Sequence, residues 1–334
     1  MAVDPGLAPF GGRVANLDQL APVVQSTTAT GPGRGMRAID ASVVDGLSIR
    51  VLPDRGFDVG AAWFAGRPLA WLSELGERPP LASLDGAAWI EAFGGGLVTT
   101  CGLRNVGAPS EGHGLHGAFS HQRARDVRIR RRVVGDCPVV VLSATIDEPG
   151  EDGALLRIQR RITLTGGRGT LEVHDVTTNL GPRAEPAPLL YHVNLGYPLL
   201  DDRGVFDVPG SLAVPRDAVS AAQTDLIDGM AGPATGTVEA VFERLLDDRP
   251  RQRAVLSSRH AGLELTVSWR RAELPRFHQW IRRDGTWYVL GLEPSNCSVL
   301  GRAHDRAAGQ LPLLGPGERR TTRIRIDVRT AVPC

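Results

Sequence analysis

Lysine is absent from this sequence, so all 38 of its basic residues are arginine. The absence excludes mechanisms that depend on a lysine amine. Among these are Schiff-base aldolases, pyridoxal-phosphate enzymes and phosphate-binding loops of the Gly-Lys-Ser/Thr type. The preference for arginine is not itself a signal of function.

Cysteine is scarce, and its positions are isolated. No two cysteines have Cys-x-x-Cys spacing, so a sulfur-rich zinc site is not expected. The positions are Cys101, Cys137, Cys297 and Cys334. The sequence also lacks a secretory signal pattern and any apolar run of about 18 residues. We therefore expect a cytoplasmic protein with reduced thiols and no membrane partner.

An excess of one charge is missing as well. The 38 basic residues are balanced by 37 acidic ones, which gives a formal net charge of +1. Proteins that bind nucleic acid usually show a basic excess on one face or segment. The densest basic segment, residues 128–132, lies in a stretch where apolar and polar residues alternate. It is interpreted as the solvent-exposed face of a strand. No nucleic-acid partner is expected.

The chain does contain many short segments that alternate apolar and polar residues. Its 334 residues, 42% of them hydrophobic, are enough for a large core in one domain or two. Alternation predicts β-strands, and 40 glycines and 24 prolines separate them with turns. The expected strands span residues 47–52, 139–146, 155–164, 171–180, 263–269, 287–292 and 322–328. Short helices are expected near 216–225 and 302–309.

Many strands without helical repeats between them predict an all-β sandwich or barrel. The most irregular polar stretch, residues 101–122, contains three histidines and several glycines. A loop of this length in a compact domain is usually functional or disordered, and its composition favours function. Exposed strand edges leave a homodimer open as an assembly.

Two histidines stand out by their surroundings. His116 lies between glycines in GLHG, and His192 lies among apolar residues in LLYHVNLGYPLL. An imidazole titrates near neutral pH, so either residue can donate or accept a proton in a reaction. The alternatives are a loop histidine without a role for His116 and a core histidine for His192.

Glu293 is the best candidate carboxylate. It continues the apolar strand WYVLGLEPSN. A buried carboxylate is costly unless it is partnered or used, because burial disfavours its charged form. The alternative is a glutamate at a strand end that faces solvent.

The spacing of His113 and His116 resembles a metal-binding pair, since residues three apart share one face of a helix. Glycine-rich text does not favour a helix here, and no third ligand is close in sequence. We expect neither a metal nor another cofactor.

A sugar site needs aromatic rings to stack on apolar sugar faces and polar side chains to bind hydroxyls. The aromatic candidate is Trp280 in RFHQWIRRDG, with plain core packing as the alternative. The expected polar substrate-binding residues are Arg55, Arg104, His113 and Asn194.

Three separated segments, GLHG, YHVNLG and GLEPSN, have the order and approximate spacing found in the galactose mutarotase (aldose 1-epimerase) superfamily. The segment LPLLGPGERRTTRIRIDV resembles the closing turn and final strand of that family. Together with FGGGLVTTCGLRN, these segments most resemble its poorly characterised aldose-epimerase-like branch. The resemblance spans residues 47–328.

The resemblance implies one antiparallel β-sandwich domain over residues 1–334, the first ~40 residues being an irregular or hairpin extension. It implies an open sugar-binding groove and a small-molecule carbohydrate as partner. Glu293 would be the base at the anomeric hydroxyl, and His192 the acid at the ring oxygen. His116 would polarise the sugar, and Arg104 would bind a hydroxyl. No cofactor or metal is required for this reaction.

These expectations point to an isomerase that interconverts the anomers of an aldose or a modified monosaccharide. Two alternatives remain open on the same fold: a lyase or hydrolase that acts on a glycoside, and a carbohydrate-binding protein without activity. The sequence departs from the family pattern at Ala118, where LHGG has its second glycine, and at Tyr191, which precedes His192. The departures leave the substrate open.

Overall fold

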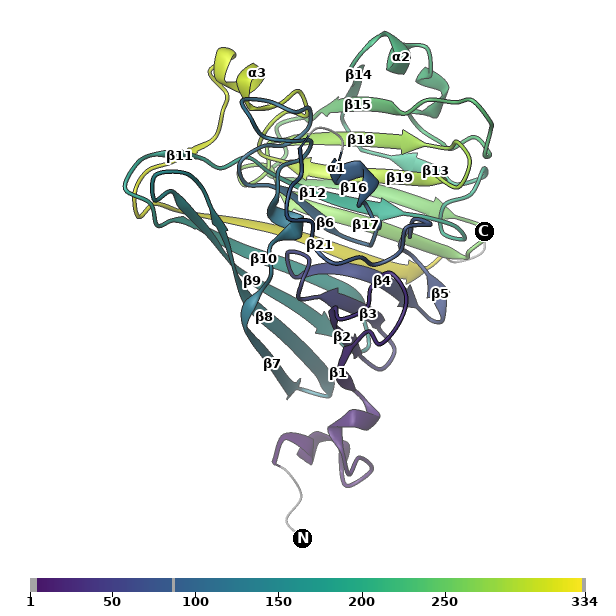
Figure 1. The fold of residues 1–334 in the computed structure, drawn as a ribbon. Helices are drawn as coiled ribbons and strands as arrows, with labels where there is room; N and C mark the ends of the chain where they lie inside the picture. Colours follow the sequence, from purple (N-terminus) through teal and green to yellow (C-terminus); the bar gives the residue numbers. More distant parts are fainter. Residues whose placement is uncertain (1–4, 86–87, 332–334) are drawn as a thin grey trace.

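The computed structural model describes residues 5–85 and 88–331, and its regular structure is mostly β-strand. Strand pairs between the described strands are antiparallel throughout. Figure 1 shows two broad layers, with the N-terminal segment projecting from one end. The all-β antiparallel sandwich that the sequence predicts is confirmed.

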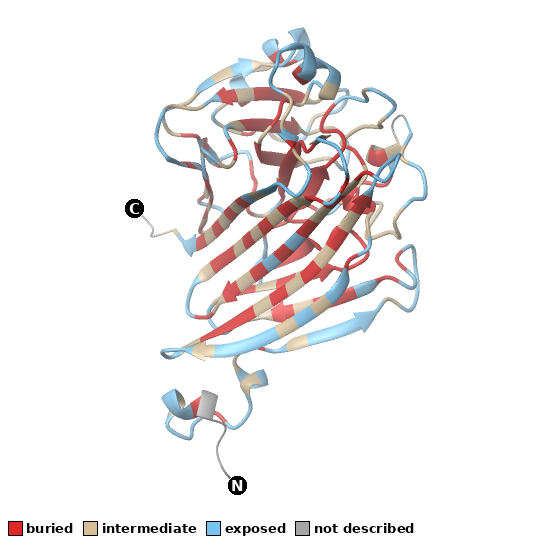
Figure 2. Ribbon diagram, turned by 90° about the vertical axis from the view of Figure 1, so that its left-hand side faces the viewer, coloured by how far each residue is buried: buried red, intermediate tan, exposed pale blue. Residues whose placement is uncertain are grey.

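The largest sheet forms one layer and has eight strands in the order β13-β16-β17-β21-β10-β9-β8-β7. Buried and more exposed residues alternate along its strands, so one face lies in the core and the other faces outward (Figure 2). The strands are β7 (Arg125–Val134), β8 (Cys137–Pro149), β9 (Leu155–Thr165), β10 (Gly169–Asn179), β13 (Val205–Asp207), β16 (Arg251–Ser258), β17 (Leu263–Arg270) and β21 (Arg319–Thr330).

A six-stranded sheet and a five-stranded sheet make up the other layer. The first, in the order β14-β15-β18-β19-β12-β6, has strands β6 (Thr99–Gly102), β12 (Leu189–Leu195), β14 (Leu212–Pro215), β15 (Ala240–Leu245), β18 (Arg276–Arg282) and β19 (Val289–Ser295). The second runs from β1 to β5: β1 (Val23–Thr27), β2 (Arg37–Ser42), β3 (Leu47–Leu52), β4 (Asp58–Phe64) and β5 (Arg67–Pro68). Single bridges join the two sheets, such as that between Val59 of β4 and Val98, the residue before β6.

Short elements complete the described chain. The helices are α1 (Ala88–Glu91), α2 (Ala218–Ala221) and α3 (Arg302–Ala307), and the 3-10 turns are η1 (Pro5–Phe10), η2 (Leu17–Gln19), η3 (Phe119–His121) and η4 (Thr224–Leu226). A small ladder pairs β11 (Glu185–Pro186) with β20 (Leu313–Leu314). Among the described helices, none has the length and apolar character to cross a membrane.

Each expected strand and helix has a counterpart in these elements, but many of the described elements were not predicted from the sequence. Among these are α1 and β12. β12 is buried along its whole length, so both of its faces are covered by other parts of the protein. Its odd-numbered residues belong to the core between the layers: Leu189, Tyr191, Val193 and Leu195. Its even-numbered residues, His192 and Asn194, therefore point to the opposite face of the sheet.

A buried arginine connects the layers. Arg160 on β9 donates to both carboxylate oxygens of Asp175 on β10, at 2.9 and 2.6 Å. It also donates to Asp58 on β4 at 2.6 Å and to the Thr100 hydroxyl on β6 at 2.8 Å. The Tyr191 hydroxyl on β12 donates to Asp175 at 2.7 Å. Burial alone lowers the pKa of Arg160, but the carboxylates, Asp175 foremost, raise it above its usual value.

This network yields a stability prediction. Replacing Arg160 with methionine keeps much of the side-chain volume but leaves two buried carboxylates without their cation. We expect a loss of about 3–5 kcal/mol in the free energy of unfolding, since breaking a buried ion pair strands a charge. Urea denaturation followed by tryptophan fluorescence measures the change.

Arg161→Met provides the matched control, because Arg161 is the next residue of β9 and is exposed on the outer face. Its effect should stay within about 0.5 kcal/mol. Equal losses for the two variants would contradict a special role for the buried guanidinium.

Candidate active site

A cavity of about 420 Å³ lies over the face of the six-stranded sheet that points away from the core. Its size falls in the range of pockets for small molecules, roughly 300–1,000 Å³. Residues of α1, of the 101–122 loop and of strands β12, β15, β18 and β19 contribute to its walls. Six of the lining residues are charged or titratable: His116, His192, Arg216, Glu239, Arg282 and Glu293.

Strand register brings His192 and Glu293 together. The antiparallel pairing of β12 with β19 sets Val193 opposite Leu292, which places His192 opposite Glu293 on the cavity face. His192 Nε2 lies 3.1 Å from Glu293 Oε1, and the two side chains are only 4% and 3% exposed. The structure thus brings together two of the three residues expected to be catalytic.

Burial shifts the ionisation of both groups in opposite directions. Burial raises the pKa of Glu293 to about 8; Glu239 adds to the rise and Arg216 opposes it. Burial likewise lowers the pKa of His192 to about 3, with nearby His116 adding to the effect. Between these values the pair holds one exchangeable proton, which rests on Glu293 beside a neutral imidazole.

Asn194, two residues further along β12, contacts the backbone of His192 through its side chain. Its amide nitrogen donates to the carbonyl oxygens of Gly96 at 2.9 Å and of His192 at 3.0 Å. The Asn194 side chain also raises the pKa of His192, against the larger effect of burial. Within the described ranges, neither His192 Nδ1 nor Asn194 Oδ1 has a hydrogen-bond partner. Asn194 therefore favours the charged imidazole, although it does not bond to the ring itself.

His116 reaches the cavity from the 101–122 loop in a left-handed backbone conformation, with φ of 58°. Its Nδ1 accepts a hydrogen bond from the Gly107 amide at 3.3 Å. Burial first, then His278 and Arg216, lower the pKa of His116 to about 4. The ring is therefore neutral near pH 7 and carries its proton on Nε2, which is available to donate to a bound molecule.

Three aromatic residues, Trp89, Phe93 and Trp280, line the cavity. Four of the six tryptophans of the chain belong to one cluster with Phe93: Trp71, Trp89, Trp280 and Trp287. Trp89 packs 4.6 Å from Phe93, and Trp280 lies 5.2 Å from the ring of His192. Such faces suit the apolar side of a sugar ring.

A glycine keeps the space between the reacting groups open. A Cβ atom at Gly291 would lie 3.0 Å from Glu293 Oε1 and 3.1 Å from His192 Cε1. Both contacts are tighter than side chains normally allow. A larger residue here would press against the pair.

Three polar lining residues were missed by the sequence reasoning: Arg216, Glu239 and Arg282. Arg216 forms an ion pair of 3.0 Å with Glu239, and the other Glu239 oxygen accepts from Trp280 Nε1 at 2.9 Å. Arg216 precedes α2 and Glu239 precedes β15, in text without a motif. The sequence offers no signal that would have found them.

Four expected substrate-binding residues do not line this cavity: Arg55, Arg104, His113 and Asn194, which contacts the backbone of His192. Arg104 is buried in an ion pair with Glu185 at 2.6 Å, and His113 Nε2 lies 2.8 Å from Arg302 Nη1. Arg55 donates to the Ser120 carbonyl oxygen at 2.8 Å, and burial lowers its pKa to about 10. Their roles in binding a sugar remain predictions that the cavity does not support.

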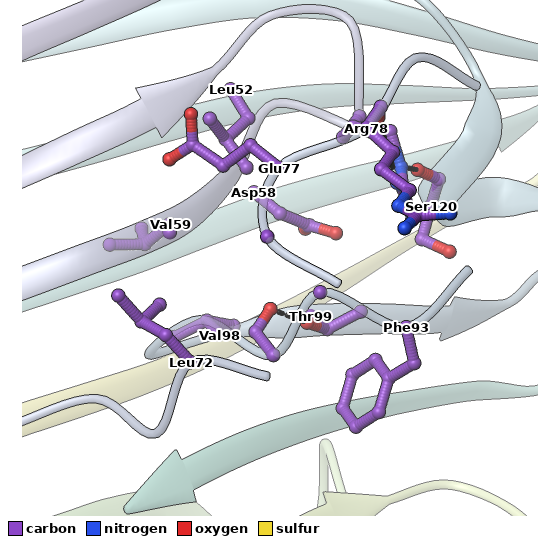
Figure 3. Close-up of a pocket in the computed structure, with 15 residues that line it drawn as sticks. Leu52, Asp58, Val59, Leu72, Glu77, Arg78, Phe93, Val98, Thr99 and Ser120 are labelled. Atoms are coloured by element: carbon purple, nitrogen blue, oxygen red, sulfur yellow. Dashed lines mark hydrogen bonds between the residues drawn. The ribbon is translucent and has the colours of Figure 1, made fainter. Parts of the chain in front are cut away.

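Arg55 borders a second, much smaller cavity of about 30 Å³, shown in Figure 3. Asp58, Thr99 and Ser120 provide polar groups there, and Phe93 lines both cavities. The volume suits about one or two water molecules but not a sugar. Among the described residues, no three His, Cys, Asp or Glu side chains are grouped to hold a metal ion.

Comparison with known proteins agrees with this architecture. Residues 33–328 match the family described as "Domain of unknown function (DUF4432)", and the chain therefore belongs to it. No curated protein matches the chain.

Solved structures share the fold at low sequence identity. A "putative aldose 1-epimerase" from Klebsiella pneumoniae superposes with a TM-score of 0.85 at 22% identity, covering 94% of this chain and 86% of its own. A galactose mutarotase-like protein from Clostridium acetobutylicum gives a TM-score of 0.61 at 13% identity, covering 93% and 99%. The resemblance to the galactose mutarotase-like superfamily is thus confirmed at the level of the fold.

The pKa of Glu293 leads to a testable pH dependence of stability. Between its ordinary value of 4.5 and about 8, the folded protein holds a proton that the unfolded chain has released. The contribution of Glu293 to stability therefore falls as pH rises through this window. Urea denaturation from about pH 5 to 9 should show wild type losing stability relative to Glu293→Gln as pH increases.

Glu264→Gln controls for the loss of one carboxylate outside the cavity. A stability difference between wild type and Glu293→Gln that does not change with pH would contradict the buried, protonated state.

Proposed function

We propose that this member of the DUF4432 family is a sugar isomerase that interconverts the anomers of an aldose or a modified monosaccharide. The observation that carries the proposal is the His192–Glu293 pair, with 3.1 Å between Nε2 and Oε1, in a cavity of sugar size. The names of the solved structures with this fold, aldose 1-epimerase and galactose mutarotase-like protein, support the same chemistry.

The spacing of the pair fits the bonds that change. In a cyclic sugar the anomeric hydroxyl oxygen and the ring oxygen are attached to the same carbon, C1. Opening the ring needs a base at the first oxygen and an acid at the second, so the two catalytic groups must stand side by side. Two groups whose nearest atoms lie 3.1 Å apart meet this condition, and each would contribute about 10²–10⁴-fold to the rate.

The proposed reaction balances without a cofactor. The base takes the hydroxyl proton, the C1–O1 bond becomes a carbonyl, and the C1–O5 bond breaks with its electrons on O5. The acid then supplies a proton to O5. Rotation about C1–C2 presents the other carbonyl face, and reclosure by the reverse steps gives the opposite anomer.

The single proton of the pair lets each group take both roles. The resemblance assigns Glu293 as base at the anomeric hydroxyl and His192 as acid at the ring oxygen. These roles require the ion-pair form of the two residues, in which His192 carries the proton and Glu293 is ionised. Because burial leaves the resting proton on Glu293, the resting pair starts with Glu293 as acid and His192 as base. Ring opening from this form exchanges the two positions: His192 takes the anomeric hydroxyl proton and Glu293 protonates the ring oxygen. Reclosure reverses both transfers, with Glu293 as base and His192 as acid, and restores the resting pair.

The side chains around the pair support these transfers. Asn194 stabilises the imidazolium that forms when His192 accepts a proton. His116 offers its Nε2 proton to a sugar oxygen near the reacting centre. The tryptophan faces then position the ring and keep water from the pair.

A glycoside hydrolase is the second candidate, because Glu239 lines the same cavity as Glu293. Hydrolysis requires two carboxyl groups on either side of the scissile bond. Glu239 is already bonded by Arg216 and by Trp280 Nε1, which favours a supporting role for it. Release of reducing sugar from glycosides distinguishes this candidate.

The first functional test is anomer exchange measured by NMR saturation transfer on a panel of aldoses, uronic acids and sugar phosphates. We expect faster exchange for at least one sugar with wild type. Glu293→Gln and His192→Gln should each reduce the enzymatic rate by about 10²–10⁴-fold, since each removes one partner of the proton transfer.

Glu264→Gln, outside the cavity, should keep the wild-type rate. Circular dichroism checks that the variants are folded. No acceleration on any sugar by a folded wild-type protein would sink the isomerase proposal, and cleavage of a glycoside would replace it with the hydrolase.

The pH profile supplies a second test. Activity should hold while the pair keeps its one proton and should fall above about pH 8, where that proton leaves Glu293. Because Glu239 raises the pKa of Glu293, Glu239→Gln should move this alkaline limb to lower pH. A limb that stays in place, or moves upward, would contradict the assignment of the limb to Glu293.

A further inference from the structure

Arg282 is a charged residue of the cavity for which no ion-pair partner is found among the described residues. It stands at the end of β18, is half-buried and lines the cavity. Within residues 5–85 and 88–331 its side chain forms no ion pair and no hydrogen bond, whereas Arg216 is paired with Glu239.

The guanidinium of Arg282 is nevertheless held in place. Its central carbon lies 4.1 Å from the ring centroid of Trp287, and Trp287 packs 4.8 Å from Trp71. Stacking on an aromatic face fixes the plane of a guanidinium and leaves the edge of its fork free. That edge matches the paired oxygens of a carboxylate or a phosphate.

The balance of charge in the cavity favours an anion. Two arginines line the walls, and the carboxyl of Glu239 is paired with one of them, Arg216, which leaves the guanidinium of Arg282 without a counter-charge among the described residues. The other lining carboxyl, Glu293, is the protonated member of the catalytic pair. In a partly enclosed cavity, an unpaired positive charge attracts anions more strongly than it does in open water.

The position of Arg282 suits the far end of a sugar whose C1 lies at the catalytic pair. The register sets His278 of β18 beside Glu293, and Arg282 is four residues further along the same strand face. Four residues of strand span about 13 Å. A monosaccharide with a terminal anionic group, together with the long arginine side chain, can bridge this separation.

We infer that the substrate is an acidic monosaccharide whose carboxylate or phosphate is bound by Arg282, with Trp287 supporting the guanidinium. This inference rests on the proposed function, because it places the reacting carbon at the His192–Glu293 pair. It adds the substrate class, which the catalytic pair alone does not specify.

Isothermal titration calorimetry on the full chain tests the inference with three probes: glucose, glucuronate and glucose 6-phosphate, repeated in the galactose series. We expect an acidic sugar to bind about 10- to 100-fold more tightly than its neutral parent, as a charge-assisted hydrogen bond provides. The preference should weaken as salt is raised. The tighter acidic probe identifies the group as carboxylate or phosphate.

Variants locate the contact. Arg282→Gln should abolish the preference for the acidic sugar, and Arg282→Lys should retain part of it as a point charge. Arg276→Gln is the matched control: Arg276 lies on the same strand face, outside the cavity, in an ion pair with Glu243. This control removes one positive charge from the strand and should leave the preference unchanged.

The outcomes separate this inference from the proposed function. Equal binding of acidic and neutral sugars, or a preference that survives in folded Arg282→Gln, overturns the inference. Anomer exchange on neutral sugars without any effect of Arg282→Gln also overturns it and leaves the isomerase intact. Arg282-dependent binding of an acidic sugar supports it even if no sugar is turned over, in which case only the isomerase proposal fails.

Discussion

The buried guanidinium of Arg160 is the contact on which the arrangement of the layers depends. It joins β9 to β10 through Asp175 and reaches β4 through Asp58, so both layers share one charge network. Tyr191 of β12 bonds to the same Asp175. A charge in the core tolerates little displacement of its partners, because any lost contact leaves an ion without compensation. The network therefore holds β12 in place at Tyr191, the residue directly before His192.

The two-residue periodicity of the strand then determines that His192 faces the candidate site. Tyr191 faces the core between the layers, so His192 must face the other side of the sheet. Pairing with β19 then determines which residue of that strand lies beside it, and the register selects Glu293. A shift of β12 by one residue would turn His192 into the core and away from Glu293, so the proposed chemistry depends on the register as closely as the core does.

Burial gives the pair its proposed reactivity. In water a glutamate is ionised and a histidine titrates near neutral pH, so the two would not share a proton across a wide range. Here burial raises the pKa of the carboxyl and lowers that of the imidazole, and one proton serves both. The same cavity carries Arg282, whose unpaired charge the proposed reaction does not need. Because the proposed reaction does not use this charge, we assign Arg282 to binding of the substrate.

The sequence by itself determined the class of fold and the identity of the central residues. Alternating segments predicted the strands because side-chain direction in a strand is a local property. GLHG, YHVNLG and GLEPSN identified His116, His192 and Glu293, and the absence of lysine removed whole classes of mechanism.

The tertiary structure decided which residues share the cavity and how they ionise. Arg216, Glu239 and Arg282 line it, although they lie in text without a motif, whereas Arg55 and Arg104 are bonded elsewhere. The physical reason is that register, packing between layers and burial join residues that are distant in the chain. Contact and pKa both depend on those neighbours, so neither is encoded in any single segment.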